Sequence, residues 1–125
     1  MHMFSTMKLT VLKSKIHCAF VTTAHLDYEG SIEIDATLMK AAGIVEYEKV
    51  LVANFTNGNR YETYVMKGEA DSGVIGVNGA GARYSQVGDK VTVFAFAQAD
   101  ASEQVSPKIV FVDKENHVKA VKPLH

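Results

Sequence analysis

The chain has 125 residues, of which 47% are hydrophobic and 22% are charged, and its formal net charge is −1. This balance is typical of a folded protein and excludes a disordered chain, so we expect a single domain over residues 1–125. The charge offers no general attraction to nucleic acid or an anionic membrane, and neither a membrane span nor a signal peptide is evident, which predicts a cytoplasmic protein.

The first expected strand covers residues 9–20, with a bulge near Lys13 where the alternation of apolar and polar residues slips. After the slip, Ile16, Cys18 and Phe20 share one phase. We therefore expect Cys18, the single cysteine, to be an inert thiol in the core that points away from its neighbour His17. One cysteine cannot form an internal disulfide, which fits a reducing compartment.

Residues 21–28 are expected to continue extended, and residues 32–35 to begin a new strand after Gly30-Ser31. Glycine enters left-handed or strained backbone without a steric penalty. A serine beside a distorted peptide can attack the preceding carbonyl. The resulting ester can break by β-elimination, which leaves a dehydroalanine that hydrolyses to a pyruvoyl group. Taken alone, a glycine-serine pair is more often an ordinary turn between strands.

Residues 36–42 are predicted to form a short helix, with Asp35 as N-cap and Gly43 as the left-handed residue that ends it. The strongest local pattern follows: strands over 49–55 and 60–66 flank an Asn-Gly pair at 57–58. That pair tolerates the two positive φ angles of a type I′ turn, which predicts a tight hairpin.

Further short strands are predicted over residues 74–77, 91–97, 109–112 and 118–121, with a polar loop over 98–106. The glycine-rich stretch 76–81 lacks the lysine and the long helix of a phosphate-binding loop, although its backbone N–H groups suit a small polar ligand. Seven or eight short strands, one or two brief helices and no β-α-β alternation predict a mainly β fold closed into a barrel.

Few side chains stand out as chemical groups. The five histidines show no metal-ligand spacing, so a metal site is not expected. Arg60 and Tyr64 share one face of their strand and could combine a carboxylate clamp with a proton donor. The more common case on such strands is a solvated arginine and a half-buried tyrosine, and most strand lysines, such as Lys15, are simply exposed.

Several stretches together resemble the aspartate 1-decarboxylase family, whose members depend on a pyruvoyl group. In the family's order along the chain, from about residue 15 to about residue 93, these are Lys15-Ile16-His17, Tyr28-Glu29-Gly30-Ser31, Thr56-Asn57-Gly58 with Arg60 and Thr63-Tyr64, Val77-Asn78-Gly79-Ala80 and Val87-Gly88-Asp89. The loop Asn78–Gly81 reads Asn-Gly-Ala-Gly where the family more often has Asn-Gly-Ala-Ala.

The resemblance implies a double-ψ β-barrel with one or two short helices, assembled as a homotetramer with active sites between neighbouring subunits. It implies a zymogen that cleaves itself between Gly30 and Ser31, giving chains 1–30 and 31–125. The cofactor would be a covalently bound pyruvoyl group made from Ser31, with neither a metal nor pyridoxal phosphate.

By the same resemblance, the pyruvoyl group forms a Schiff base with L-aspartate. The α-carboxylate leaves as CO2, and the product is β-alanine for pantothenate and coenzyme A biosynthesis. Tyr64 would be the proton donor. The other implied site residues, which hold substrate or assist processing, are Lys15, Arg60, Thr63, Gly79, Ala80 and Gly81. A non-catalytic double-ψ-barrel binding module and a pyruvoyl decarboxylase of another amino acid remain as alternatives.

Overall fold

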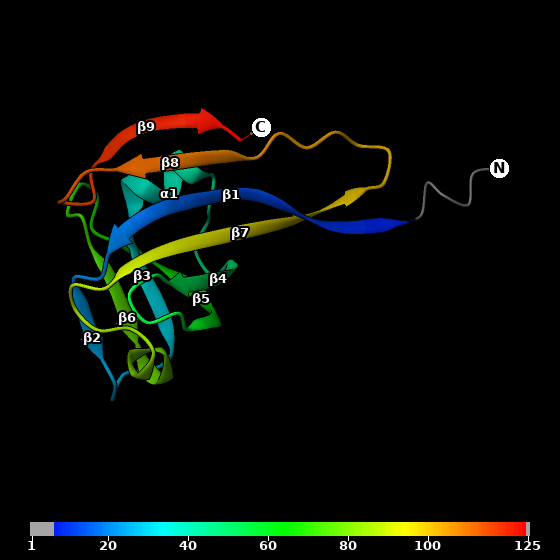
Figure 1. Ribbon diagram of the computed structural model, residues 1–125. Helices are drawn as coiled ribbons and strands as arrows, with labels where there is room; N and C mark the ends of the chain where they lie inside the picture. The colour runs from blue at the N-terminus through cyan, green and yellow to red at the C-terminus, as the bar shows by residue number, and fades with distance from the viewer. Residues whose placement is uncertain (1–6, 125) are drawn as a thin grey trace.

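The computed structural model describes residues 7–124, which form a mainly β fold with one short α-helix and a 3-10 helix, η2 (Figure 1). The elements are β1 (Lys8–Phe20), β2 (Thr23–His25), β3 (Ser31–Asp35), α1 (Ala36–Ala42), β4 (Lys49–Asn54), β5 (Arg60–Gly68), β6 (Ile75–Asn78), η2 (Gly79–Arg83), β7 (Lys90–Asp100), β8 (Lys108–Val112) and β9 (Val118–Pro123). The mainly β prediction is confirmed.

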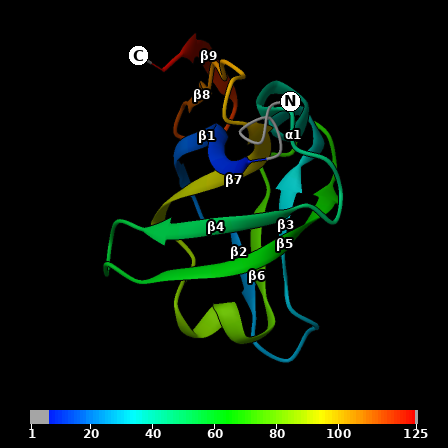
Figure 2. The ribbon, with the colours of Figure 1, turned by 90° about the vertical axis from the view of Figure 1, so that its right-hand side faces the viewer.

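The strands join in the order β2-β6-β3-β5-β4-β7-β1-β8-β9. β3 lies inside this sheet, parallel to β5 and antiparallel to β6. Figure 2 shows β4 and the start of β5 running across the direction of β2, β3 and β6, so the sheet is strongly bent. The first half of β1 and the end of β7 extend beyond the other strands as a two-stranded arm (Figure 1).

β1 contains two irregularities, of which the sequence predicted the first. Its register with β7 shifts around Lys13, as expected, and shifts again between Ile16 and Ala19. Within the second bulge Cys18 takes a φ of 53°, which inverts the alternation: Ala19 is buried and Cys18 is only half-buried. The predicted core position of Cys18 is therefore wrong. Its Sγ lies 3.4 Å from Nε2 of His17 instead of on the opposite face.

The extended segment expected over residues 21–28 is shorter than predicted. β2 covers only Thr23–His25, and the chain turns directly after it. The N–H of Tyr28 donates to the carbonyl of His25 at 3.4 Å, and the two rings stack with their centroids 4.5 Å apart. This turn separates β2 from β3, so Tyr28 does not end a strand.

α1 begins and ends at the predicted residues, and Asp35 does more than cap it. Its carboxylate accepts the N–H of Thr37 at 2.8 Å and, from the turn that precedes β6, the N–H groups of Asp71 at 2.9 Å and Gly73 at 2.8 Å. Gly43 ends the helix with a φ of 71°. The buried Asp35 therefore joins the end of β3, the start of α1 and the turn before β6.

The β4–β5 hairpin is confirmed, but its turn is not type I′. Gly58 has a φ of 81°, whereas Asn57 is not among the residues with a positive φ. The N–H of Asn54 donates to the carbonyl of Asn59 at 2.8 Å, and the Asn54 side-chain oxygen accepts the N–H of Thr56 at 2.8 Å. The buried Asn54 side chain thus organises the loop, which is longer than a two-residue turn.

The strands predicted after the hairpin are all found, with shifted ends. β7 runs to Asp100 because its last residues pair with Lys8, Leu9 and Thr10 of β1, so the start of the expected polar loop is strand. The stretch expected as a loop after residue 78 contains η2. Within residues 7–124, no helix is long and apolar enough to cross a membrane.

The core positions the inner strands through aliphatic side chains. Ile32 and Ile34 of β3 are fully buried and pack in one cluster with Leu38 of α1 and with Val65 of β5. Burying a large aliphatic side chain stabilises a fold by about 1.5–3 kcal/mol. β3, which carries the Gly30-Ser31 junction at its start, is therefore among the most firmly held strands.

We expect Asp35→Ala to lower the free energy of unfolding by about 2–4 kcal/mol, because three backbone N–H groups lose a charged acceptor. Asp35→Asn is the matched control: it keeps one carbonyl acceptor and should lose less. Urea unfolding at one fixed protein concentration measures both. An Asp35→Ala chain with an unchanged midpoint and slope would contradict this role.

Candidate functional site

Ser31 is the first residue of β3 and is 5% exposed. It pairs with Asn78, the last residue of β6, and the Nδ2 of Asn78 donates to the Oγ of Ser31 at 3.1 Å. Because the hydroxyl oxygen accepts this bond, its position is fixed while its proton stays available to another acceptor. The structure therefore holds a buried, oriented hydroxyl next to the Gly30 carbonyl.

Ser31 opens onto a hollow of about 540 Å³ between the turn after β2 and strands β3, β5 and β6. Tyr64, which is 38% exposed, lines the same hollow. The full lining is Asp27, Tyr28, Glu29, Ser31, Glu33, Tyr64, Met66, Lys67 and Asn78. The structure thus brings together two of the predicted site residues and adds Asn78. The sequence offered Asn78 only as part of a loop motif, without a role.

The glycine on which the junction depends is Gly79 and not Gly30. Gly30 has no positive φ, and a Cβ built on it would meet nothing within 4 Å, so this glycine does not use its freedom to adopt left-handed backbone. Gly79 has a φ of 74°, and a Cβ there would lie 2.7 Å from Cα and 2.8 Å from N of Gly30. The start of η2 therefore packs directly against the backbone just before Ser31.

Arg60 and Lys15 lie elsewhere in the chain, above one aromatic ring. The guanidinium carbon of Arg60 is 5.7 Å, and Nζ of Lys15 is 5.6 Å, from the ring centre of Phe94 on β7. In the strand order, β7 and β3 lie on opposite sides of β5. Arg60 is the first residue of β5, the strand of Tyr64, and Lys15 pairs with Phe94 in the β1–β7 ladder. Neither cation lines the hollow that contains Ser31.

The remaining predicted residues lie beside the hollow and do not line it. Thr63 is half-buried on the face of β5 opposite Tyr64, as strand alternation requires. Ala80 is exposed at the start of η2. A Cβ on Gly81 would lie 3.0 Å from the ring of Tyr61, so the glycine permits tight packing at this position.

Two pKa values near these residues are shifted. Burial lowers the pKa of His17, and the neighbouring charges of Lys15 and Lys90 lower it further, so His17 is neutral over a wider pH range than a free imidazole. Burial raises the pKa of Tyr61. The hydrogen bond to Ser85 lowers this pKa in part, and the negative charge of Asp89 raises it slightly. Neither group lines the Ser31 hollow.

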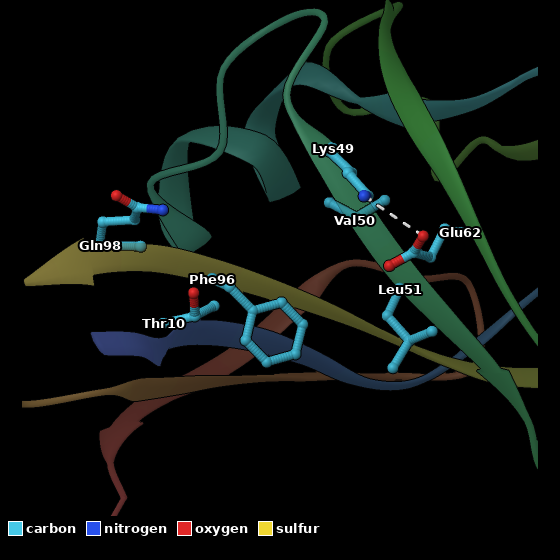
Figure 3. A pocket seen from close by; sticks show the side chains of 8 residues that line it. Thr10, Lys49, Val50, Leu51, Glu62, Phe96 and Gln98 are labelled. Carbon is cyan, nitrogen blue, oxygen red and sulfur yellow. Dashed lines mark ion pairs between the residues drawn. The ribbon is translucent and has the colours of Figure 1, made fainter. Parts of the chain in front are cut away.

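A second hollow, of about 430 Å³, lies between the arm and the β4–β5 hairpin. Figure 3 shows Lys49 and Glu62 facing each other at its edge, 3.2 Å apart, beside the apolar side chains of Leu51 and Phe96. It contains none of the predicted site residues. Across residues 7–124, no group of three or more histidine, cysteine, aspartate or glutamate side chains could hold a metal ion.

Comparison with known proteins identifies relatives over almost the whole chain. A model of the family described as "Aspartate decarboxylase" matches residues 7–119. The aspartate 1-decarboxylase of Coprothermobacter proteolyticus is 52% identical over 118 residues, covering 94% of this chain and 98% of the relative. Those of Caldicellulosiruptor bescii and Lactiplantibacillus plantarum are 57% and 54% identical, each over 90% of this chain and 89% and 88% of the relative.

Proposed function

The chain belongs to the aspartate decarboxylase family, and from that membership we propose that it removes the α-carboxylate of L-aspartate as CO2 and releases β-alanine. The observation that carries the proposal is the buried Ser31 hydroxyl, held by Asn78 at the wall of a hollow shared with Tyr64. This arrangement supplies a nucleophile for self-processing and a proton donor for turnover in one place. The product would serve pantothenate biosynthesis.

We propose that Ser31 is the precursor of a pyruvoyl group. Its Oγ attacks the Gly30 carbonyl, the acyl group moves from nitrogen to oxygen, and elimination breaks the ester. Hydrolysis of the new terminus then consumes water and releases ammonia, leaving segments 1–30 and 31–125. The residues fit this group, because Ser31 begins a strand and lines a hollow. Once formed, the group would supply a ketone that withdraws electrons from the bond to the departing carboxylate.

The charges favour a site completed by a second copy of the chain. Three acidic side chains, Asp27, Glu29 and Glu33, line the Ser31 hollow with one base, Lys67. L-aspartate carries two carboxylates, which such a lining disfavours. The cations suited to them, Arg60 and Lys15, lie over Phe94 instead. We propose a homotetramer in which a neighbouring subunit supplies these cations.

The roles of the remaining site residues and the barrel architecture are proposed mainly from the family resemblance. We propose Tyr64 as the proton donor to the α-carbon, since it lines the same hollow as Ser31 and its phenolic O–H can donate a proton. Thr63 would assist processing, and the amides of Gly79, Ala80 and Gly81 would hold substrate. The bent, continuous sheet supports a double-ψ β-barrel in a single domain. A cytoplasmic location agrees with the single free cysteine.

The two alternatives are less well supported. A non-catalytic binding module would have no use for Ser31, Arg60 and Tyr64 together. A pyruvoyl decarboxylase of another amino acid would share the processing chemistry and differ in substrate. Since every relative named above is an aspartate 1-decarboxylase, aspartate is the substrate of choice for the assay.

Ser31→Ala tests the proposed function as a whole. Without the hydroxyl there is no nucleophile for the acyl shift. Denaturing intact-mass spectrometry should find one uncleaved chain, and an assay for β-alanine should find no product. Ser102→Ala, in an exposed loop, should cleave and turn over like the wild type. A Ser31→Ala chain that still splits after Gly30 would refute self-processing by this hydroxyl.

Gly79→Ala tests the contact with the processing junction. We expect slower cleavage, because the new methyl group would displace Gly30 from its position beside Ser31. Gly58→Ala is the matched control: its φ of 81° is similarly unfavourable for alanine, but its Cβ would meet nothing within 4 Å. The time course of cleavage in purified precursor measures both. Equal rates in the two variants would show that backbone strain alone explains the effect.

Tyr64→Phe separates processing from turnover. The variant keeps the ring and loses only the phenolic proton, so we expect normal cleavage and a fall in β-alanine formation of about 10²- to 10⁴-fold. Tyr47→Phe, which removes an exposed phenol outside the hollow, should leave the rate unchanged. Turnover at the wild-type rate in a fully cleaved Tyr64→Phe enzyme would remove Tyr64 from the role of acid.

A further inference from the structure

Glu33 shares the Ser31 hollow but has no role in the chemistry described so far. It lies two residues after Ser31 in β3, so the alternation of the strand places both side chains on one face. Their Cα atoms are about 6.6 Å apart along the strand. Both residues line the hollow, and Glu33 is half-buried. A glutamate side chain is long enough to bring its carboxylate beside whatever approaches residue 31.

Two glycines on neighbouring strands form a slot for this side chain. Glu33 pairs with Gly76 of β6, and a Cβ on Gly76 would lie 3.4 Å from Oε1 of Glu33. On β5, a Cβ on Gly68 would lie 3.1 Å from Cγ of Glu33. The 3.1 Å distance is tight and the 3.4 Å distance is close to an ordinary contact, and each added Cβ would also lie 2.5 Å from another side chain, Thr23 at Gly76 and Val74 at Gly68. The missing side chains therefore leave room for the stem of Glu33, and the stem is confined between two strands.

Within residues 7–124, the carboxylate held in this way has no hydrogen-bond or ion-pair partner. Among the described residues, Glu33 forms no ion pair and no side-chain hydrogen bond. Lys67 lines the same hollow but is exposed and is not paired with it. Asp27 and Glu29 are exposed and therefore well solvated. A half-buried carboxylate that lines a hollow can form a charge-assisted hydrogen bond with a positively charged ligand group.

We propose that Glu33 binds the ammonium group of the amino-acid substrate and holds that nitrogen next to residue 31. The inference rests on the proposed function, in which the substrate amine must reach the group made from Ser31. A charge-assisted bond from the ammonium to Glu33 would orient the amine toward that group. It would also select substrates that carry an amine over dicarboxylates that do not.

Glu33→Gln tests this assignment because it keeps the size of the side chain and removes the charge. We expect intact mass to show normal cleavage, and KM for L-aspartate to rise about tenfold through loss of a charge-assisted bond. Succinate, which is aspartate without the amine, is the second probe. Its Kd for the cleaved protein, measured by calorimetry, should stay unchanged or decrease, because no ammonium contact is lost and a nearby negative charge is removed.

Two further variants make the result specific. Glu69→Gln, which removes the same charge from an exposed turn outside the hollow, should change neither constant. Glu33→Asp retains the charge on a shorter stem and should restore part of the aspartate affinity. A merely structural role predicts that Glu33→Gln weakens aspartate and succinate together, and this outcome would overturn the proposal. So would an unchanged KM. A wild-type chain without β-alanine formation would instead refute the proposed function itself.

Discussion

The candidate site depends on the pairing of β3 along both of its edges. β5 and β6 hold Ile32 and Ile34 in the core, and each end of the strand has an additional anchor. At its end, the Asp35 carboxylate binds three backbone N–H groups. At its start, Asn78 donates to the Ser31 hydroxyl. Because the reaction of a serine with its own preceding peptide requires fixed geometry, a firmly held strand start is what self-processing needs.

Buried polar side chains hold the connections between strands in the same way. The Asn116 side chain donates to the carbonyls of Phe20 and Gly73 and accepts the N–H of Phe20, each at 2.8 Å. Asn54 organises the hairpin loop and also donates to Asp89 at 2.8 Å. These are satisfied groups in a low-dielectric interior, where such bonds are strong and a lost partner is costly. Loops that would otherwise vary are thereby tied to particular strands.

The fold places the Ser31 hydroxyl and the cations of Arg60 and Lys15 at different sites, which bears on how copies of the chain would assemble. Ser31 and Tyr64 line an acidic hollow, whereas Arg60 and Lys15 lie outside it and share the ring of Phe94. Read with the family membership, this division favours an active site built from two copies of the chain. Under the same proposal, the Glu33 carboxylate, which forms no ion pair within residues 7–124, would bind the ammonium group of the amino acid.

The sequence by itself determined the features that depend on neighbouring residues. Asp35 and Gly43 delimit α1, the Asn-Gly pair predicts a hairpin, and the ordered motifs identify the family. Only the tertiary structure decided features set by contacts between distant residues. The bulge at Cys18 inverts a strand face, and the left-handed Gly79 packs against the backbone of Gly30. Asn78 reaches Ser31 from 47 positions away. Caps and alternation are encoded locally, whereas such contacts arise only when the folded sheet brings its strands together.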